Sequence, residues 1–458
     1  MPYTSMEELK SAIDGVIEPG QTGVEIRDED ALRGDRIDRL ARSAVFGDEA
    51  VREAARWLIW SASQALGCAS TSIQGLYDAM GRGDVSGFTV PAINLRGLTY
   101  DAARTVFRAA LELGTGPVIF EIARSEIGYT EQRPAEYASS VLAAAIKEGW
   151  NLPVMLQGDH FQVNRKKFQA DPDAEMSAVK ELTREAVAAG FYNIDVDTST
   201  LVDLDQPTVS EQQRANYERC AEITRLVREI EPEGITVSVG GEIGEVGGKN
   251  STVEEFSAFM DGFAATAPDL KGISKISVQT GTAHGGVPLP DGTVADVKLD
   301  FGVLEAIGAV ARERYGISGA VQHGASTLPD EAFHRFPETG TSEIHLATGF
   351  QNIIYDHERF PAELRDRIYA HLDEACAGDR KAGQTDEQFL YKTRKKGFGP
   401  FKRELWDLPA DVRGAIMGAL EKKFSFLFDK LATRDTVGVL KRHVLPVAVA
   451  RPRPASLG

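Results

Sequence analysis

Three histidines follow short apolar segments, at positions where predicted strands end. They are His160, His284 and His323, and the chain has only eight histidines in all. Three imidazoles around a divalent cation, with a fourth position left open, form the usual catalytic zinc site. Each histidine alone is equally compatible with a hydrogen-bonded residue at the rim of a fold. The three together favour a metal site.

The segments before these histidines belong to a repeating pattern of predicted strands and helices. From residue 87, β-branched or apolar runs alternate with Ala-, Leu- and Glu-rich stretches that are typical of helices. The expected strands cover residues 88–93, 117–122, 153–157, 191–196, 236–239, 273–278, 319–322 and 343–346. Eight βα units over roughly 265 residues predict an α/β fold of the (β/α)8 TIM-barrel type, with chemistry at the C-terminal ends of the strands. An open doubly wound sheet is the alternative, but no GxGxxG turn follows the first strand.

The segments outside the alternating pattern are predicted to be helical. We therefore expect an N-terminal extension over residues 1–85, a catalytic barrel over 86–375 and a C-terminal extension over 376–458. The final residues, 446–458, contain three prolines and are expected to be frayed. Cys68, Cys220 and Cys376 form no CxxC pair, which indicates buried reduced thiols.

Composition limits the partners of the chain. It has 68 acidic and 51 basic residues, a net charge of −17, and 42% hydrophobic residues, which is typical of a soluble globular protein. The acidic balance argues against nucleic acid or an anionic membrane as the main partner. The sequence shows no signal-peptide pattern and no apolar run of about 18 residues, so we expect a cytoplasmic protein.

Several short motifs together resemble the zinc-dependent class II aldolases, typified by fructose-bisphosphate aldolase. They are Gly-Asp-His at 158–160, Gly-Glu-Ile-Gly at 241–244 followed by Gly-Gly at 247–248, Gly-Thr-Ala-His-Gly at 281–285 and His-Gly-Ala-Ser at 323–326. Val-Pro-Ala-Ile-Asn at 90–94 resembles the first strand of that family. The resemblance covers about residues 87–350, in the same order. It implies Zn²⁺ or another divalent metal, optionally a monovalent cation, and a homodimer or homotetramer.

The resemblance assigns roles around the metal. His160, His284 and His323 would hold the cation, which polarises the oxygens of a dihydroxyacetone-phosphate unit. Asp159 would exchange a proton with the hydroxyl on the carbon that becomes the aldehyde; the alternative is that it only orients His160.

Two further carboxylates match family positions near the metal. Glu242 corresponds to a glutamate with a catalytic or ligand role, and Asp197 to a ligand at a second or alternate metal position. The alternative for both is a buried carboxylate that accepts hydrogen bonds.

Polar and glycine residues at the strand ends are expected to bind the substrate. Glycines allow the backbone N–H groups to approach a phosphate closely. The expected substrate-binding residues are Asn94, Ser125, Gly285, Gly324, Ser326, His345 and Thr348.

The sequence departs from the family in two places. His345 and Ala347 occupy positions where typical members have Asn and Asp, and His345 could donate a hydrogen bond there or reach the metal. Lys249 and Asn250 replace acidic residues of a loop that supplies a proton-transfer glutamate. We expect a nearby glutamate, Glu245, Glu254 or Glu255, to take over that role, and Glu245 is counted among the candidate catalytic residues.

A basic run over residues 392–403 lies in the C-terminal extension. Such a run is usually a solvated helix face. The more specific interpretation is that it covers the barrel mouth, in cis or from a neighbouring subunit. Lys396 and Arg403 would then bind the distal phosphate of a bisphosphate.

These inferences predict a class II aldolase, a carbon–carbon lyase of glycolysis and carbohydrate metabolism. Its expected substrate is fructose 1,6-bisphosphate, cleaved to dihydroxyacetone phosphate and glyceraldehyde 3-phosphate. Alternatives are another phosphorylated ketose, such as tagatose 1,6-bisphosphate or a ketose 1-phosphate, and a non-catalytic metal-binding barrel that assembles with an enzyme. A metal hydrolase also fits three histidines and an aspartate, but it fits the glycine-rich loops less well.

Overall fold

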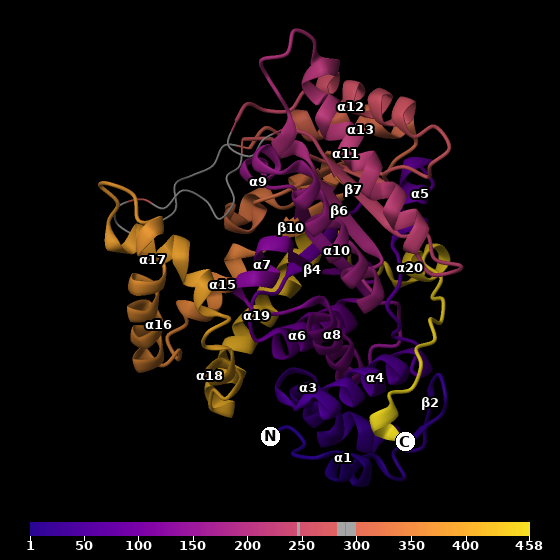
Figure 1. Cartoon of the computed structure of the whole chain (residues 1–458), viewed down its shortest axis with the longest axis vertical. Helices are drawn as coiled ribbons and strands as arrows, with labels where there is room; N and C mark the ends of the chain where they lie inside the picture. Colours follow the sequence, from indigo (N-terminus) through magenta and orange to yellow (C-terminus); the bar gives the residue numbers. More distant parts are fainter. Residues whose placement is uncertain (245–247, 282–288, 290–298) are drawn as a thin grey trace.

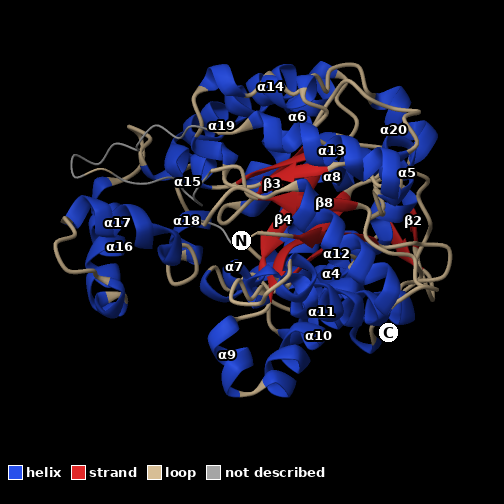
Figure 2. Ribbon diagram, turned by 90° about the horizontal axis from the view of Figure 1, so that it is seen from above, coloured by secondary structure: helices blue, strands red, loops and turns tan. Residues whose placement is uncertain are grey.

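The expected barrel is present in the computed structural model, which describes residues 1–244, 248–281, 289 and 299–458. Its strands are all parallel and close into a ring in the order β10-β3-β4-β5-β6-β7-β8-β9. Figure 2 shows the strands in the middle of a shell of helices. The strand bounds are β3 Val90–Asn94, β4 Ile119–Ala123, β5 Met155–Gln162, β6 Asn193–Asp197, β7 Ser238–Glu242, β8 Lys275–Val278, β9 Ala320–Gln322 and β10 Glu343–Leu346.

The first and last strands of the barrel pair with each other and complete the ring. His345 of β10 stands beside Ala92 of β3 in this register. Because side chains alternate between the two faces of a strand, every second residue points into a closed barrel. Here the inward positions of several strands carry charged residues instead of the usual branched apolar ones, so the barrel interior is unusually polar.

Helices follow the strands and cover the outside of the barrel. They form as expected from Ala- and Leu-rich segments with an apolar face. A capping box, in which Thr252 and Glu255 satisfy each other's backbone N–H groups, fixes the start of α12. The bounds are α6 Thr99–Leu113, α7 Arg124–Tyr129, α8 Pro134–Glu148, α9 Arg165–Ala170, α10 Pro172–Ala189, α11 Val209–Ile230, α12 Val253–Thr266, α13 Phe301–Tyr315, α14 Arg335–Glu338 and α15 Thr348–Tyr355.

The N-terminal segment is helical, as predicted, and also contains a small antiparallel hairpin of β1 and β2. Helices α3 and α4 pack against α8 of the barrel shell. Figure 1 shows α1, α3 and α4 at one end of the molecule, together with both chain termini, whereas α5 lies apart from them, near α13 and α20. The bounds are α1 Met6–Ile13, β1 Ile17–Pro19, β2 Val24–Ile26, α2 Glu29–Ala31, α3 Ile37–Phe46, α4 Glu49–Ala65 and α5 Gln74–Gly81.

The C-terminal helices divide into two groups. Helices α16 to α18 form a lobe beside the barrel (Figure 1), whereas α19 packs against α6. The buried Arg394 attaches this lobe to the helix after β10, because its guanidinium donates to Asp356 Oδ1 (2.5 Å) and Asn352 Oδ1 (2.6 Å). The bounds are α16 Ala362–Ala375, α17 Asp386–Thr393, α18 Lys402–Trp406, α19 Ala410–Lys430 and α20 Val437–His443, with a 3₁₀ turn at Arg394–Gly397. The domain boundaries at 85/86 and 375/376 remain a prediction.

The prediction of a frayed C-terminal tail is wrong. The indole N–H groups of Trp57 and Trp60 donate to the carbonyls of Arg451 (3.0 Å) and Val449 (2.9 Å). The Arg451 guanidinium lies 3.3 Å from the centre of the Trp60 ring, and Leu457 is buried. Proline content suggested disorder, but the segment instead docks on α4 as an extended strap.

Two smaller expectations can also be compared with the structure. Cys68, Cys220 and Cys376 are buried and form no disulfide, as predicted. Within the described part of the chain, no helix has both the length and the apolar character needed to cross a bilayer.

Candidate active site

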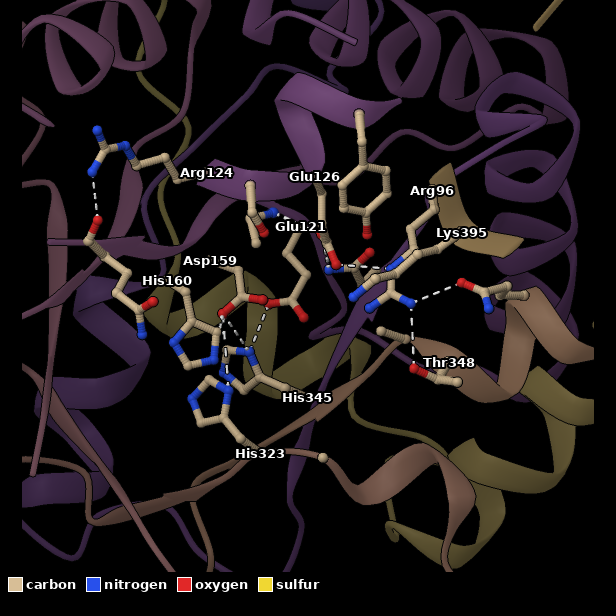
Figure 3. Close-up of a pocket in the computed structure, with 18 of the residues that line it drawn as sticks. Arg96, Glu121, Arg124, Glu126, Asp159, His160, His323, His345, Thr348 and Lys395 are labelled. Carbon is tan, nitrogen blue, oxygen red and sulfur yellow. Dashed lines mark hydrogen bonds and ion pairs between the residues drawn. The ribbon is translucent and has the colours of Figure 1, made fainter. Parts of the chain in front are cut away.

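A cavity of about 800 Å³ opens at the C-terminal ends of the barrel strands. Figure 3 shows Asp159, His160, His323 and His345 together in it, with Arg124 on one side of this group and Arg96 and Lys395 on the other. The group lies where barrel enzymes place their chemistry.

A bulge in β5 aims His160 into the cavity. Sequence patterns placed Asp159 and His160 after this strand, but β5 continues to Gln162 with a register shift between Gly158 and Phe161. His160 has φ +39°, which is strained for a residue with a side chain. Gly158 has to be glycine because a Cβ there would lie 2.5 Å from the Phe161 ring. The bulge therefore turns two consecutive side chains, Asp159 and His160, toward the same space.

Three imidazoles converge on one oxygen of Asp159. Its Oδ1 lies 3.8 Å from His160 Nε2, 3.9 Å from His323 Nδ1 and 3.3 Å from His345 Nδ1. The ring centres of His160 and His323 are 4.2 Å apart, and those of His323 and His345 are 3.9 Å apart. Residues of β5 and β10 and the first residue after β9 thus form one compact cluster of nitrogen and oxygen donors.

This cluster fits a divalent metal. One ligand atom from each of Asp159, His160 and His323 lies within 4.8 Å of the other two. Imidazole and carboxylate donors suit Zn²⁺ and similar cations. The Nε2 atom of His323 lies 2.8 Å from Ser277 Oγ, which orients the ring and leaves Nδ1 toward the cavity. His284, the third expected imidazole, lies outside the described residues.

A second group of potential ligands lies on the other ring nitrogen of His160. His160 Nδ1 is 3.1 Å from both Asp197 Oδ2 and Glu242 Oε2. Burial opposes ionisation of Asp197, but the hydrogen bond and charge of His160 outweigh it and lower its pKa. Burial, followed by the charge of Asp197, raises the pKa of Glu242 to about 7. The two carboxylates therefore differ in how readily they ionise.

A buried ion network lies beneath the histidines. Lys275, whose side chain is 1% exposed, lies 2.9 Å from Asp195 Oδ1 and 2.5 Å from Glu343 Oε1. Its ammonium also donates to Gln157 Oε1 at 2.8 Å, and the Tyr77 hydroxyl donates to Glu343. Burial opposes ionisation of Glu343, but Lys275 and then His345 lower its pKa well below the usual range. Burial above all raises the pKa of Asp195 to about 6, against the attraction of Lys275.

Glu121 connects this network to the cavity. Its Oε2 lies 2.9 Å from His345 Nδ1 and accepts a hydrogen bond from Gln157 Nε2 at 3.1 Å. Burial, followed by the charge of Asp159, raises the pKa of Glu121 to about 8. The site therefore contains more buried carboxyl groups than a single metal ligand set needs.

Cationic and N–H groups border the cavity on the side of β3 and β10. Arg96 donates to Glu126 Oε1 (2.8 Å) and Gln351 Oε1 (2.9 Å), so it holds a fixed position. The Lys395 ammonium lies 5.6 Å from the centre of the Tyr129 ring, and burial, followed by the charge of Arg96, lowers its pKa. This side of the cavity is suited to an anion.

Two backbone turns add donors nearby. Gly324 has φ +68° and precedes the 3₁₀ turn Ala325–Thr327, and helix α15 begins at Thr348. The Ser326 hydroxyl accepts from the N–H of Gly349 at 3.0 Å, which holds the two turns together. N–H groups at helix starts are common anion-binding groups.

Most sequence-predicted residues that the structure describes line the cavity. These are Asn94, Ser125, Asp159, His160, His323, Gly324, Ser326, His345 and Thr348. Asp197 and Glu242 contact His160 from outside this lining. The predicted Glu245, His284 and Gly285 lie outside the described residues.

The structure places two predicted phosphate ligands elsewhere, which corrects the sequence-based choice. Lys396 Nζ pairs with Asp379 at 2.5 Å, and the Arg403 guanidinium lies 4.5 Å from the centre of the Phe46 ring. Their neighbours Lys392 and Lys395 line the cavity instead. Consecutive residues of a helical turn point in different directions, so a basic run alone does not identify which lysine faces the site.

Sequence reasoning missed five polar residues inside the barrel, which are Glu121, Gln157, Asp195, Lys275 and Glu343. The sequence carries a signal for most of them, because polar residues recur at every second position within a strand and therefore point to the same side of it. The pairs are Gln157 and Asp159, Asp195 and Asp197, Lys275 and Ser277, and Glu343 and His345.

Comparisons with known proteins agree with this geometry. A family model described as "Fructose-bisphosphate aldolase class-II" matches residues 77–394, more than half of the chain. The D-tagatose-1,6-bisphosphate aldolase subunit GatZ of Escherichia coli K12 is 28% identical over 162 residues. That match covers 32% of this chain and 38% of GatZ, so the chain spans well under half of this relative.

Solved structures of low sequence identity share the fold. The fructuronate-tagaturonate epimerase UxaE of Cohnella laeviribosi superposes with a TM-score of 0.56 at 13% identity, over 92% of this chain and 90% of UxaE. A Sinorhizobium meliloti protein described as a probable tagatose 6 phosphate kinase gives a TM-score of 0.50 at 17% identity, over 78% of this chain and 98% of that one. At these identities the likeness concerns the fold alone.

Proposed function

Because the chain belongs to the class II fructose-bisphosphate aldolase family, we propose that it is a metal-dependent aldolase that cleaves or forms a ketose bisphosphate. The first-choice substrate is fructose 1,6-bisphosphate, with dihydroxyacetone phosphate and glyceraldehyde 3-phosphate as products. The observation that carries the proposal is the convergence of His160 and His323 on Asp159 in a cavity at the C-terminal rim of the barrel.

The proposed metal ligands are His160 and His323, joined by His284. A bound divalent cation, with Zn²⁺ as the first choice, supplies Lewis-acid stabilisation of negative charge that develops on substrate oxygens. Ser277 holds the His323 ring, and Asp197 and Glu242 hold the far nitrogen of His160. Imidazole rings held by such contacts keep their metal-binding nitrogens in place while substrate enters and leaves.

Asp159 is the proposed proton acceptor for cleavage. Its carboxylate lines the cavity next to the imidazoles, and it is proposed to accept the proton from the hydroxyl on the carbon that becomes the aldehyde. General-base catalysis of this kind contributes roughly 10²–10⁴ in rate. In the reverse direction the same group returns the proton to the new hydroxyl.

The phosphate groups are proposed to bind at two places. The N–H groups after Gly324 and at the start of α15, together with the Ser326 and Thr348 hydroxyls, suit the phosphate on the dihydroxyacetone side. Lys395, supported by Arg96 and Lys392, offers positive charge for the second phosphate. Lys392 and Lys395 line the cavity of their own chain, which supports a contact in cis with the second phosphate.

A specific observation favours a second candidate function, that of a barrel subunit in a two-component aldolase. The relative GatZ is described as a subunit of D-tagatose-1,6-bisphosphate aldolase. His345 and Ala347 replace the Asn and Asp that typical class II members carry at these positions. Under this candidate, the chain keeps its metal cluster and needs a partner chain for turnover.

A metal analysis combined with a coupled triose-phosphate assay tests the proposal. The substrate panel contains fructose 1,6-bisphosphate, tagatose 1,6-bisphosphate and ketose 1-phosphates, with fructuronate and tagaturonate as comparison compounds because of the fold shared with UxaE. We expect cleavage of a phosphorylated ketose that stops with a chelator and returns with Zn²⁺. Bound metal without turnover of any phosphorylated ketose would contradict the aldolase and favour the subunit.

A further inference from the structure

Glu121 and His345 form a carboxylate–imidazole pair that the proposed reaction does not use. We propose that Glu121, His345 and Asp159 create a second binding position for a divalent first-row metal, such as Zn²⁺ or Mn²⁺, beside the first. This inference extends the metal centre of the proposed function. It does not depend on turnover, because Glu121 and His345 belong to neither ligand set named above.

The three donor atoms are already spaced like ligands of one cation. Glu121 Oε2 lies 2.9 Å and Asp159 Oδ1 3.3 Å from His345 Nδ1, and the ligand atoms of all three residues lie within 4.8 Å of one another. Atoms that each lie about 2.0–2.2 Å from one metal ion are about 3 Å apart when they occupy neighbouring coordination positions. Figure 3 shows the Glu121, Asp159 and His345 side chains pointing toward one another.

The surroundings of His345 determine which nitrogen is available. Its Nε2 lies 2.6 Å from Glu343 Oε1, and Lys275 lies 2.5 Å from the same oxygen, which keeps Glu343 ionised. A nitrogen and an ionised oxygen this close share a proton, so Nε2 carries the hydrogen. A neutral imidazole then has its lone pair on Nδ1, which is the arrangement found in metal-binding histidines that contact a carboxylate through the other nitrogen.

With that tautomer, a nitrogen lone pair and two carboxylate oxygens face one another in a buried space. Glu121, Asp159 and His345 are 1%, 5% and 4% exposed, so water screens their repulsion poorly. A positive charge at the centre removes the repulsion. Either a metal ion or a proton, on Nδ1 or on Glu121, supplies it, and these two kinds of occupant are the outcomes that the experiment separates.

The barrel interior contains many more acidic than basic groups. Among the described residues, six buried carboxyl groups surround the histidines, and Lys275 is the one lysine in contact with them. The six are Glu121, Asp159, Asp195, Asp197, Glu242 and Glu343. With all six ionised, Lys275 and a single dication at His160 and His323 balance three of the six negative charges, and a second dication beside Glu121 balances two more.

The neighbours of Glu121 also hold it in place as a ligand. Gln157 Nε2 donates to Glu121 Oε2 at 3.1 Å and to Glu343 Oε1 at 2.9 Å, so one amide fixes both carboxylates. The His345 ring stacks on His323 with centres 3.9 Å apart, which places the second position next to the first. Asp159 Oδ1 lies between the two positions, 3.8 Å from His160 Nε2 and 3.3 Å from His345 Nδ1.

Metal content of the full chain tests the proposal. The protein is stripped with a chelator, reloaded with excess Zn²⁺ or Mn²⁺, desalted and analysed by inductively coupled plasma mass spectrometry. We expect two ions per wild-type chain and the loss of one in Glu121→Gln and in His345→Gln. Glu136→Gln is the matched control, because Glu136 is a buried glutamate paired with Lys402 (2.7 Å) outside the barrel interior, and it should keep both ions.

Anomalous diffraction from wild-type crystals at the metal edge gives a second readout that needs no variant. We expect a peak between Glu121 and His345. Metal content that Glu121→Gln leaves unchanged, or crystals with a peak at His160 and His323 alone, would overturn the second position and assign the charge on His345 to a proton. Failure of the aldolase assay with both ions bound would contradict the proposed function and leave this inference standing.

Discussion

Replacing Lys275 by methionine should destabilise the protein strongly, because it removes the lysine that balances two buried carboxylates. Methionine fills most of the space, so the main loss is electrostatic. Asp195 and Glu343 would remain in a dry interior without the ammonium that now lies 2.9 and 2.5 Å away. Breaking a buried ion pair by removing one partner costs about 3–5 kcal/mol.

That free energy converts into a measurable shift of the melting temperature. An unfolding entropy of about 2.1 cal/mol/K per residue gives about 1 kcal/mol/K for 458 residues. The Lys275→Met variant should therefore melt about 3–5 °C lower than wild type in differential scanning fluorimetry. Lys271→Met is the control, because Lys271 is 51% exposed and its pair with Asp78 is worth about 1 kcal/mol or less.

The same variant should lose more stability at alkaline than at acidic pH. Without Lys275, burial raises the pKa values of Asp195 and Glu343 above those of the unfolded chain, which are about 4. The folded state then holds protons that the unfolded state has released, so stability is retained below pH 4 and falls as pH rises through the folded pKa values. The melting difference from wild type should be larger at pH 8 than at pH 5.5. A shift no larger than that of Lys271→Met at both pH values would refute this account.

Other variants test the site and the tail. Lys395→Ala should raise KM for a bisphosphate about 10–100-fold, as expected for the loss of one charged hydrogen bond. Lys396→Ala is the control and should leave KM unchanged, because Lys396 pairs with Asp379. Equal effects of the two variants would contradict the placement of Lys395 at the substrate. Asp159→Asn should keep the metal bound by the imidazoles and lower kcat about 10²–10⁴-fold, whereas normal turnover would remove Asp159 as the base. Deleting residues 447–458 should lower the melting temperature by about 4 °C, because four hydrogen bonds of about 1 kcal/mol each join Val449 and Arg451 to α4. An unchanged melting temperature would show that this C-terminal segment adds no stability.

The barrel was predictable from sequence because its signals are local. Each strand combines apolar residues with a polar or glycine-containing segment after it, and each helix has an apolar face. The order of motifs also placed Asp159, His160 and His323 at one rim, because parallel strands in a barrel all end on the same side. The strand positions in the structure differ from the expected ones mainly at β5, where the bulge extends the strand past His160.

The remaining features depend on contacts between distant residues. Lys275, Asp195 and Glu343 lie in segments read as apolar strands, and they are stable there because they pair with one another across the barrel. Lys395 and Lys396 are equivalent by composition, and only the packing of the 3₁₀ turn decides which one faces the cavity. The tail looked disordered because its partners, Trp57 and Trp60, lie almost at the other end of the chain.

The docking of the C-terminal segment on α4 also has a consequence for how the chain folds during protein synthesis. Trp60 leaves the ribosome 389 residues before the Val449 carbonyl that its indole contacts. At about 5–20 residues per second, the indole waits roughly 20–80 s for this partner. During that time the α4 surface has to stay exposed or covered by something else. One of the first helices to be translated therefore obtains some of its final contacts among the last.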